Sequence, residues 1–493
     1  MFENLQPTIV WQHFATLCQI PRPSKHEGPL RDHLQHWAQA RQLETIIDTA
    51  GNLIIRKPAS KGCETAPGVV LQAHLDMVCQ KNANSNHDFT RDPIRAVVEN
   101  GWVKAPDTTL GADNGMGVAM MLAVLEDTGL KHGPIEALFT VDEEAGMGGA
   151  HGLQPGLLQG RLMLNLDTEE WGEFYLGCAG GVDVNVERPG QAQSLPDGYV
   201  PLKISLQGLR GGHSGVNIHE GRGNAIKWLV RVLLDLSQRF DVRLSSLQGG
   251  TARNALPREA FATLAVPAQH QTSIAAAVEQ WQDLLIQEWS DIEPKLALRI
   301  QAAEGVTQIL STAEQAIWLN SLNAAPHGVQ RMSLKVPGVV ETSNNLGMVD
   351  VRPAHGSCNF MVRSLIESGF NALADQIISL FQLSGTSASA SGQYPGWAPN
   401  PASPLLAQCQ AVYRQLHGQD AHLQVIHAGL ECGLIAAKYP GMDIVSFGPT
   451  IRGAHAPGEA VEIKAVDRTW SLLRHILQAL ANGACEPATS LPY

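Results

Sequence analysis

The chain has 493 residues, of which 44% are hydrophobic and 17% charged, and its formal net charge is −12 at pH 7. This length exceeds one ordinary domain, so we expect at least two domains and a large buried core. No apolar run approaches the ~20 residues of a membrane helix. The acidic charge argues against nucleic acid or an anionic membrane surface as a partner.

The N-terminal segment lacks the basic start, apolar core and small-residue cleavage site of a secretion signal. Eight cysteines are scattered along the chain without a CxxC pair. This usage is typical of cytoplasmic proteins. We therefore expect a cytoplasmic location.

The first half of the chain alternates helical and strand-like segments. Residues 5–45 have the apolar spacing of two helices, interrupted at "PRPSK". Short apolar runs then alternate with helical stretches such as "NGMGVAMMLAVLEDTG"; the runs are "GVVLQAHLDMV", "IEALFTVDEE" and "GRLMLNLD". Strands separated by helices favour an α/β fold, with a mixed, mostly parallel sheet flanked by helices.

Two stretches rich in turn residues divide the chain. We interpret "ERPGQAQSLPDGY" (187–199) and "SGTSASASGQYPGWAPNPASP" (384–404) as linkers. The segment between them mixes strands with an amphipathic helix, which indicates an inserted α+β domain. We expect a catalytic domain in two parts, 1–186 and 396–493, and an inserted domain over 187–395. The last part would complete the first domain's sheet.

Polar side chains follow the apolar runs, where the carboxyl ends of parallel strands collect ligands. The residues concerned are His74, Asp76, Asp113, Glu143, Glu144, Asp167 and His455. Each alone has an ordinary interpretation, such as surface acids, a helix cap or a loop histidine. Together, several buried carboxylates require a cation, because like charges raise one another's pKa and burial penalises ionised groups.

The kind of ion follows from the candidate ligands. Histidine and carboxylate donors without cysteine fit zinc in a catalytic site, with cobalt or manganese as substitutes. One carboxylate that bridges two sets of terminal donors suits two ions ~3.5–4 Å apart. The sequence therefore predicts a site for two divalent metal ions.

Five motifs in this order and spacing resemble the co-catalytic di-zinc metallopeptidases, a family that includes carboxypeptidase G2, peptidase T and the carnosinases. The motifs are "HLD", "LGADNG", "DEEAGMGGA", "NLD" and "GAHAPGE". The sequences of these motifs are most similar to those of the family's bacterial aminoacyl-histidine dipeptidases. The resemblance implies a zinc exopeptidase-like catalytic domain, an inserted lid and dimerisation domain, and a homodimer.

The resemblance also implies roles for the residues at the strand ends. His74 and Asp167 would bind one ion, Glu144 and His455 the other, and Asp113 both. Asp76 would orient His74 through the other ring nitrogen. Glu143 would be the general base; the alternatives are a further metal ligand or a structural acid.

Four residues after position 200 resemble the family's substrate-binding positions. His213, in "GLRGGHSGVNIHEGRGNA", would contact the oxygen of the tetrahedral intermediate; the alternative is an exposed histidine in a tight connection. Arg363, in "NFMVRS", would bind the peptide's C-terminal carboxylate, and Asn254 would contact substrate. Glu431, in "HAGLECG", would meet the substrate's amino terminus.

The predicted function is metal-dependent hydrolysis of dipeptides that have a free N-terminus, with Xaa-His preferred. A water activated by two metal ions would attack the peptide bond, with Glu143 as general base. One alternative is a related amidohydrolase, such as a tripeptidase or an N-acyl amino acid deacylase. Another is a non-catalytic metal-binding protein on the same scaffold.

Overall fold

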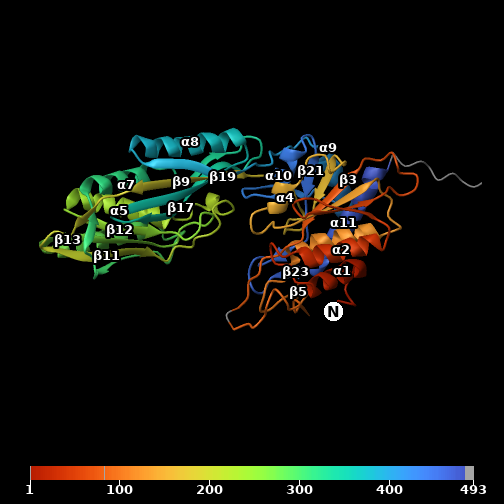
Figure 1. The fold of residues 1–493 in the computed structure, drawn as a ribbon, viewed down its shortest axis with the longest axis horizontal. Coiled ribbons are helices and arrows are strands. Elements are labelled where there is room, and N and C mark those ends of the chain that lie inside the picture. The colour runs from red at the N-terminus through yellow and green to blue at the C-terminus, as the bar shows by residue number, and fades with distance from the viewer. Residues whose placement is uncertain (1, 83, 483–493) are drawn as a thin grey trace, which may run out of the picture. The chain divides into compact units, whose positions relative to one another are not determined.

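The computed structural model describes residues 2–82 and 84–482. These residues divide into two compact units. Unit 1 comprises residues 1–177, 399–425 and 430–493, apart from the undescribed positions, and unit 2 comprises 178–398 and 426–429. Figure 1 shows that both ends of the chain, in red to orange and in blue, build unit 1.

A mixed, mostly parallel sheet forms the centre of unit 1. Its strands, in spatial order, are β1 (Glu44–Ile47), β2 (Leu53–Lys57), β6 (Ile135–Thr140), β3 (Val69–His74), β7 (Leu162–Asn165), β21 (Asp443–Ser446), β8 (Glu173–Cys178) and β20 (His422–Ile426). The four central strands β6, β3, β7 and β21 run parallel, whereas β1, β2 and β8 pair antiparallel. This confirms the predicted fold class.

Helices and a small antiparallel sheet complete unit 1. The helices are α1 (Thr8–Gln19), α2 (Gly28–Gln39), α3 (Ala112–Glu126), α4 (Gly148–Gly152), α9 (Pro404–His417), α10 (Glu431–Lys438) and α11 (Ile463–Ala481). The small sheet contains β22 (Ile451–Arg452), β23 (Ala460–Glu462), β5 (Trp102–Lys104) and β4 (Val97–Glu99). In the part of the chain that the structure describes, no helix combines the length and apolar character needed to cross a membrane.

Burial explains the sequences of the central elements of unit 1. Strands β3 and β6 are buried at every residue, as strands covered on both faces are, so their sequences are nearly continuous apolar runs. Helix α3 packs against β3 and α1 and is buried from Asn114 to Leu125, so it is apolar on all sides. These elements give the strand ends of the sheet a rigid support.

Unit 2 has a long antiparallel sheet covered by helices. The sheet contains, in spatial order, β14 (Ala297–Ala302), β11 (Tyr199–Gln207), β13 (Ala260–Pro267), β12 (Arg243–Gly249), β17 (Val340–Val351), β18 (His355–Ser364), β9 (Gly180–Pro189) and β19 (Ser387–Tyr394), with β16 (Gly328–Met332) paired to β17. Strands β10 (Ala192–Ser194) and β15 (Gln308–Leu310) form a separate pair. The α-helices are α5 (Ala225–Arg239), α6 (Gln271–Trp289), α7 (Thr312–Ala324) and α8 (Glu367–Leu383).

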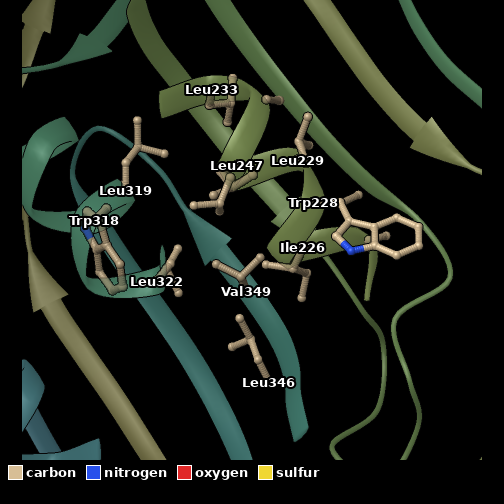
Figure 2. Close-up of a cluster of buried hydrophobic side chains, with 14 of the residues drawn as sticks. Ile226, Trp228, Leu229, Leu233, Leu247, Trp318, Leu319, Leu322, Leu346 and Val349 are labelled. Carbon is tan, nitrogen blue, oxygen red and sulfur yellow. The ribbon is translucent and has the colours of Figure 1, made fainter. Parts of the chain in front are cut away.

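The core of unit 2 lies between its helices and its sheet. Figure 2 shows Leu229 and Leu233 of α5 close to Leu247 of β12, with Leu319 of α7 beside them. All four side chains are at most 2% exposed. Burying one such side chain stabilises the fold by about 1.5–3 kcal/mol, so these contacts hold α5 and α7 on the sheet.

Both stretches interpreted as linkers contain strand residues of unit 2, which corrects that interpretation. The first includes the end of β9 and all of β10, and the second contains β19, Ser387–Tyr394, at the edge of the sheet. β19 is mostly exposed, and its backbone pairs with β9. Small residues there supply no apolar alternation, so the backbone pairing that forms the strand leaves no signal in the sequence.

Candidate metal centre

The sheet of unit 1 brings the predicted ligands to one edge. His74 is the last residue of β3, Glu143 and Glu144 follow β6, and Asp167 follows β7. Because β6, β3 and β7 are adjacent and parallel, their carboxyl ends lie side by side. Asp113 comes from the first turn of α3.

The carboxylate of Asp113 lies between two histidines. Its Oδ1 is 3.1 Å from His74 Nε2, and its Oδ2 is 3.1 Å from His455 Nε2. Asp167 Oδ1 is 3.3 Å from His74 Nε2, and Glu144 Oε1 is 3.0 Å from His455 Nε2. Asp113 thus belongs to two sets, each with one histidine and one further carboxylate.

His455 completes the second set from a loop near the C-terminus. It follows β22 and adopts a left-handed backbone conformation, with φ of +66°. This conformation costs a non-glycine residue roughly 1–3 kcal/mol unless the surroundings impose it, and such residues are concentrated at functional sites. The observed conformation therefore agrees with a functional position for this loop.

The pKa values at the site reflect its crowded charges. Burial lowers the pKa of His74, but Asp167 and Asp113 raise it well above the ordinary value. Burial raises the pKa of Asp167 to about 6, while hydrogen bonds to Asp113 and Glu144 raise that of His455 to about 11. Burial and neighbouring acids also raise the pKa of Glu143. The carboxylates of Asp113, Glu144 and Asp167 therefore stabilise a positive charge placed among them.

These donors fit divalent metal ions. Among the described residues, three groups have ligand atoms within 4.8 Å of one another: His74 with Asp113 and Asp167, Asp113 with Glu144 and His455, and His74 with Glu143 and Glu144. Imidazole and carboxylate donors in such groups suit zinc and related ions. The crowding of anions supplies the physical reason for a cation at this edge.

Asp76 supports both His74 and the turn after β6. Its Oδ1 is 3.3 Å from His74 Nδ1, a position from which a carboxylate can orient the imidazole ring. Its carboxylate also accepts hydrogen bonds from the backbone N–H groups of Glu143 and Glu144, each at 3.0 Å, and from Ser24 Oγ at 2.7 Å. The sequence does not predict the backbone bonds, because "HLD" and "DEE" are far apart along the chain.

Asn114 and Glu431 support the site in ways that the motifs do not reveal. Asn114 Nδ2 donates to Asp167 Oδ1. Glu431, at the start of α10, is fully buried, and its Oε2 accepts bonds from Gln72 Nε2 at 2.7 Å and Thr140 Oγ1 at 2.6 Å. These bonds tie the Glu431 carboxylate to side chains of the neighbouring strands β3 and β6. Its contact with a substrate stays a prediction.

The other predicted substrate-binding residues lie together in unit 2. His213 and Ala255 form an antiparallel bridge, and Ser214 N–H donates to the carbonyl oxygen of Asn254 at 2.8 Å. Arg363, on β18, is 4% exposed and donates to Tyr394 Oη at 2.6 Å. The hydroxyl it meets is neutral, so this contact does not balance the guanidinium charge.

The ring of His213 is held in one tautomer. Its Nδ1 accepts hydrogen bonds from Gly215 N–H at 3.1 Å and Val216 N–H at 3.0 Å, so Nε2 carries the hydrogen. Burial, together with the charge of Arg363, lowers the pKa of His213 to about 4. A Cβ at Gly215 would lie 1.8 Å from the carbonyl oxygen of His427, so this turn requires glycine. His213 is thus a neutral hydrogen-bond donor.

The fold and the histidine and carboxylate cluster define a metallopeptidase. Residues 70–479 match the model of Peptidase family M20/M25/M40, and the chain belongs to this family. The family resemblance inferred from the motifs is confirmed.

Among its relatives, the cytosol non-specific dipeptidase of Escherichia coli (strain K12) is 45% identical over 477 residues, which cover 97% of this chain and 98% of the relative. A crystal structure of aminoacylhistidine dipeptidase from Vibrio alginolyticus is 44% identical with a TM-score of 0.88, and the match covers 97% of this chain and 98% of that one. The aminopeptidase PepT from Bacillus cereus ATCC 10987 is 16% identical with a TM-score of 0.57, covering 97% and 100%, and shares the fold.

Proposed function

We propose that this protein is a metal-dependent dipeptidase that acts on dipeptides with a free N-terminus. The observation that carries the proposal is the position of the Asp113 carboxylate. Its Oδ1 lies 3.1 Å from His74 Nε2, and its Oδ2 lies 3.1 Å from His455 Nε2. The near full-length relatives, both dipeptidases, support the substrate class. Xaa-His dipeptides are the preferred substrates in this proposal, in line with the relative from Vibrio alginolyticus.

The site would hold two divalent ions, with zinc as the native metal and cobalt or manganese as substitutes. His74 and Asp167 would bind one ion, Glu144 and His455 the other, and Asp113 both. This assignment follows the two groups of donors that share Asp113. Bound divalent ions polarise a carbonyl oxygen and make a water molecule more acidic.

Glu143 is the proposed general base. Its backbone N–H is fixed by Asp76, and its side chain lies in one donor group with His74 and Glu144. From this position the carboxylate takes a proton from the attacking water and transfers it to the leaving nitrogen. Asp76 holds the turn that carries it.

Unit 2 supplies three of the proposed substrate-binding groups, His213, Arg363 and Asn254, and unit 1 supplies the fourth, Glu431. His213 donates its Nε2 hydrogen to the oxygen that becomes negative in the tetrahedral intermediate. The guanidinium of Arg363 binds the C-terminal carboxylate, whose two oxygens match its fork. Asn254 contacts the peptide, and Glu431 would bind the amino terminus. In this proposal the inserted domain also acts as a lid, and the protein is a cytoplasmic homodimer.

A substrate panel tests the proposal. Chelator-treated protein is reconstituted with Zn²⁺, Co²⁺ or Mn²⁺ and assayed against Xaa-His dipeptides, other dipeptides, tripeptides and N-acetylated amino acids. We expect hydrolysis of dipeptides only, fastest for Xaa-His, and none before reconstitution. Turnover confined to tripeptides or acetylated substrates would replace the dipeptidase by the corresponding amidohydrolase. Metal binding without turnover of any substrate would indicate a non-catalytic protein.

A further inference from the structure

One buried carboxylate holds the backbone segment that carries Asp113. Glu459 is 2% exposed, and it accepts hydrogen bonds from four consecutive backbone N–H groups. Its Oε2 binds those of Leu110 and Gly111 at 2.7 and 2.8 Å, and its Oε1 binds those of Ala112 and Asp113 at 2.8 and 3.1 Å. Glu459 therefore fixes the peptide groups up to and including that of Asp113.

These bonds serve the start of α3, where N–H groups lack partners within the helix. The residue before α3, Gly111, has no side chain that could cap them. A carboxylate from 346 residues further along the chain takes this role and interacts favourably with the positive end of the helix dipole. The bonds also offset the cost of burying the charge of Glu459.

A buried arginine, Arg22, holds the same segment through the carbonyl oxygen of Gly111. Arg22 is 3% exposed and donates to the carbonyl oxygen of Gly111 at 2.5 Å. It also donates to the carbonyl oxygens of Leu75 at 2.8 Å and Asp76 at 2.9 Å. The segment before Asp113 is therefore tied to the end of the "HLD" motif, next to His74.

Glu459 belongs to the same short loop as His455. In this loop Gly458 N–H donates to the carbonyl oxygens of Ala105 and Thr108, at 3.0 and 3.1 Å. The loop thus approaches Asp113 twice: His455 Nε2 lies 3.1 Å from its side chain, and Glu459 accepts its backbone N–H. Movement of the backbone at Asp113 would therefore change the distances from its carboxylate to both His74 and His455.

We propose that Glu459 is a positioning residue that sets the affinity of both metal sites together. It does so by fixing the backbone of Asp113, the residue that belongs to both proposed metal sites. The inference rests on the proposed two-metal function. A ligand of a single site, such as Glu144, affects mainly its own ion, whereas loss of Glu459 affects both.

The test is a Co²⁺ titration of chelator-treated protein, followed by visible absorption and calorimetry. We compare wild type with Glu459→Gln, Glu459→Asp and Glu144→Gln, and use Glu99→Gln, an exposed acid on β4, as the control. In Glu459→Gln we expect both binding steps to weaken, each by about 10-fold or more, as for other supporting residues of metal sites. Glu459→Asp should be intermediate, because it keeps the charge but withdraws the oxygens.

Three results separate the explanations. Glu144→Gln should weaken chiefly one of the two Co²⁺ binding steps, and Glu99→Gln should weaken neither step. Excess metal should restore much of the dipeptidase activity of Glu459→Gln. The positioning role is overturned if well-folded Glu459 variants, judged by circular dichroism, bind both ions as wild type does or lose only one. Wild-type protein that binds no Co²⁺ would instead overturn the two-metal function on which the inference rests.

Discussion

At the scale of single residues, substitution of Glu143 distinguishes a role in catalysis from a role in metal binding. Its proposed role is proton transfer, whereas the two proposed metal sites, which share Asp113, use other side chains. Glu143→Gln keeps the shape but removes the basic oxygen, so we expect kcat to fall by about 10²–10⁴-fold. Metal content, measured by mass spectrometry, should stay at the wild-type value. A variant that turns over normally, or that loses an ion, would show that Glu143 has another role.

Arg363 tests how the substrate's carboxyl end is recognised. Its contact with the hydroxyl of Tyr394 does not balance its charge, so a substrate carboxylate can do so. A hydrogen bond to a charged group contributes about 1.5–3 kcal/mol. We therefore expect Arg363→Met to lower kcat/KM for a dipeptide by about 10- to 100-fold. For the same dipeptide with an amidated C-terminus the substitution should matter little, and equal losses on both substrates would refute the contact.

The sequence predicts that the candidate ligands lie together, but it does not predict the residues that hold them in place. Acids and histidines at the ends of apolar runs predict one cluster, and the structure places His74, Asp113 and His455 together. Glu459 is part of a recognised motif, yet its bonds to the backbone before Asp113 arise only when segments far apart in the chain fold together. The full burial of Glu431 is likewise a result of tertiary packing.

At the scale of elements, the turn into α3 depends on a glycine. Gly111 has φ of +70°, and a Cβ there would lie 2.5 Å from Arg22 Nη2. Gly156 is a matched control in unit 1, with φ of +87° and no atom within 4 Å of its Cβ position. The left-handed conformation alone costs alanine about 1–2 kcal/mol. We expect Gly111→Ala to cost about 1–3 kcal/mol more than that, because it also clashes with Arg22.

Thermal unfolding of the chelator-treated variants measures this difference. At about 2–4 °C per kcal/mol, the Tm of Gly111→Ala should lie several degrees below that of Gly156→Ala. Equal Tm values would mean that the turn adjusts without disturbing Arg22. Co²⁺ affinity should fall in Gly111→Ala only.

The sequence predicts helices and strands well where their side chains are buried, and poorly where backbone hydrogen bonds alone form the element. The buried strands β3 and β6 and the helix α3 carry strong apolar patterns, and each was expected from the sequence. The edge strand β19 has small, mostly exposed residues, and its sequence indicates a linker instead of a strand. Its pairing partner, β9, lies about 200 residues earlier in the chain, where local pattern gives no indication of the contact.

At the scale of the whole molecule, the metal centre depends on folding of both ends of unit 1. β21, from the last part of the chain, lies between β7 and β8, and His455 and Glu459 come from the loop between β22 and β23. The donors therefore meet only in the folded chain. Because ions that bind the folded state alone stabilise it, metal binding and stability of unit 1 should be coupled.

In the proposed site, Asp113 is the ligand that two metal ions share. Anomalous diffraction from crystals of the zinc-loaded protein, recorded on both sides of the zinc absorption edge, tests it most directly. We predict two zinc peaks, each about 2.0–2.2 Å from a different oxygen of Asp113. One peak should also contact His74 and Asp167, and the other Glu144 and His455. A single ion, or two ions of which either lacks Asp113 as a ligand, would contradict the account.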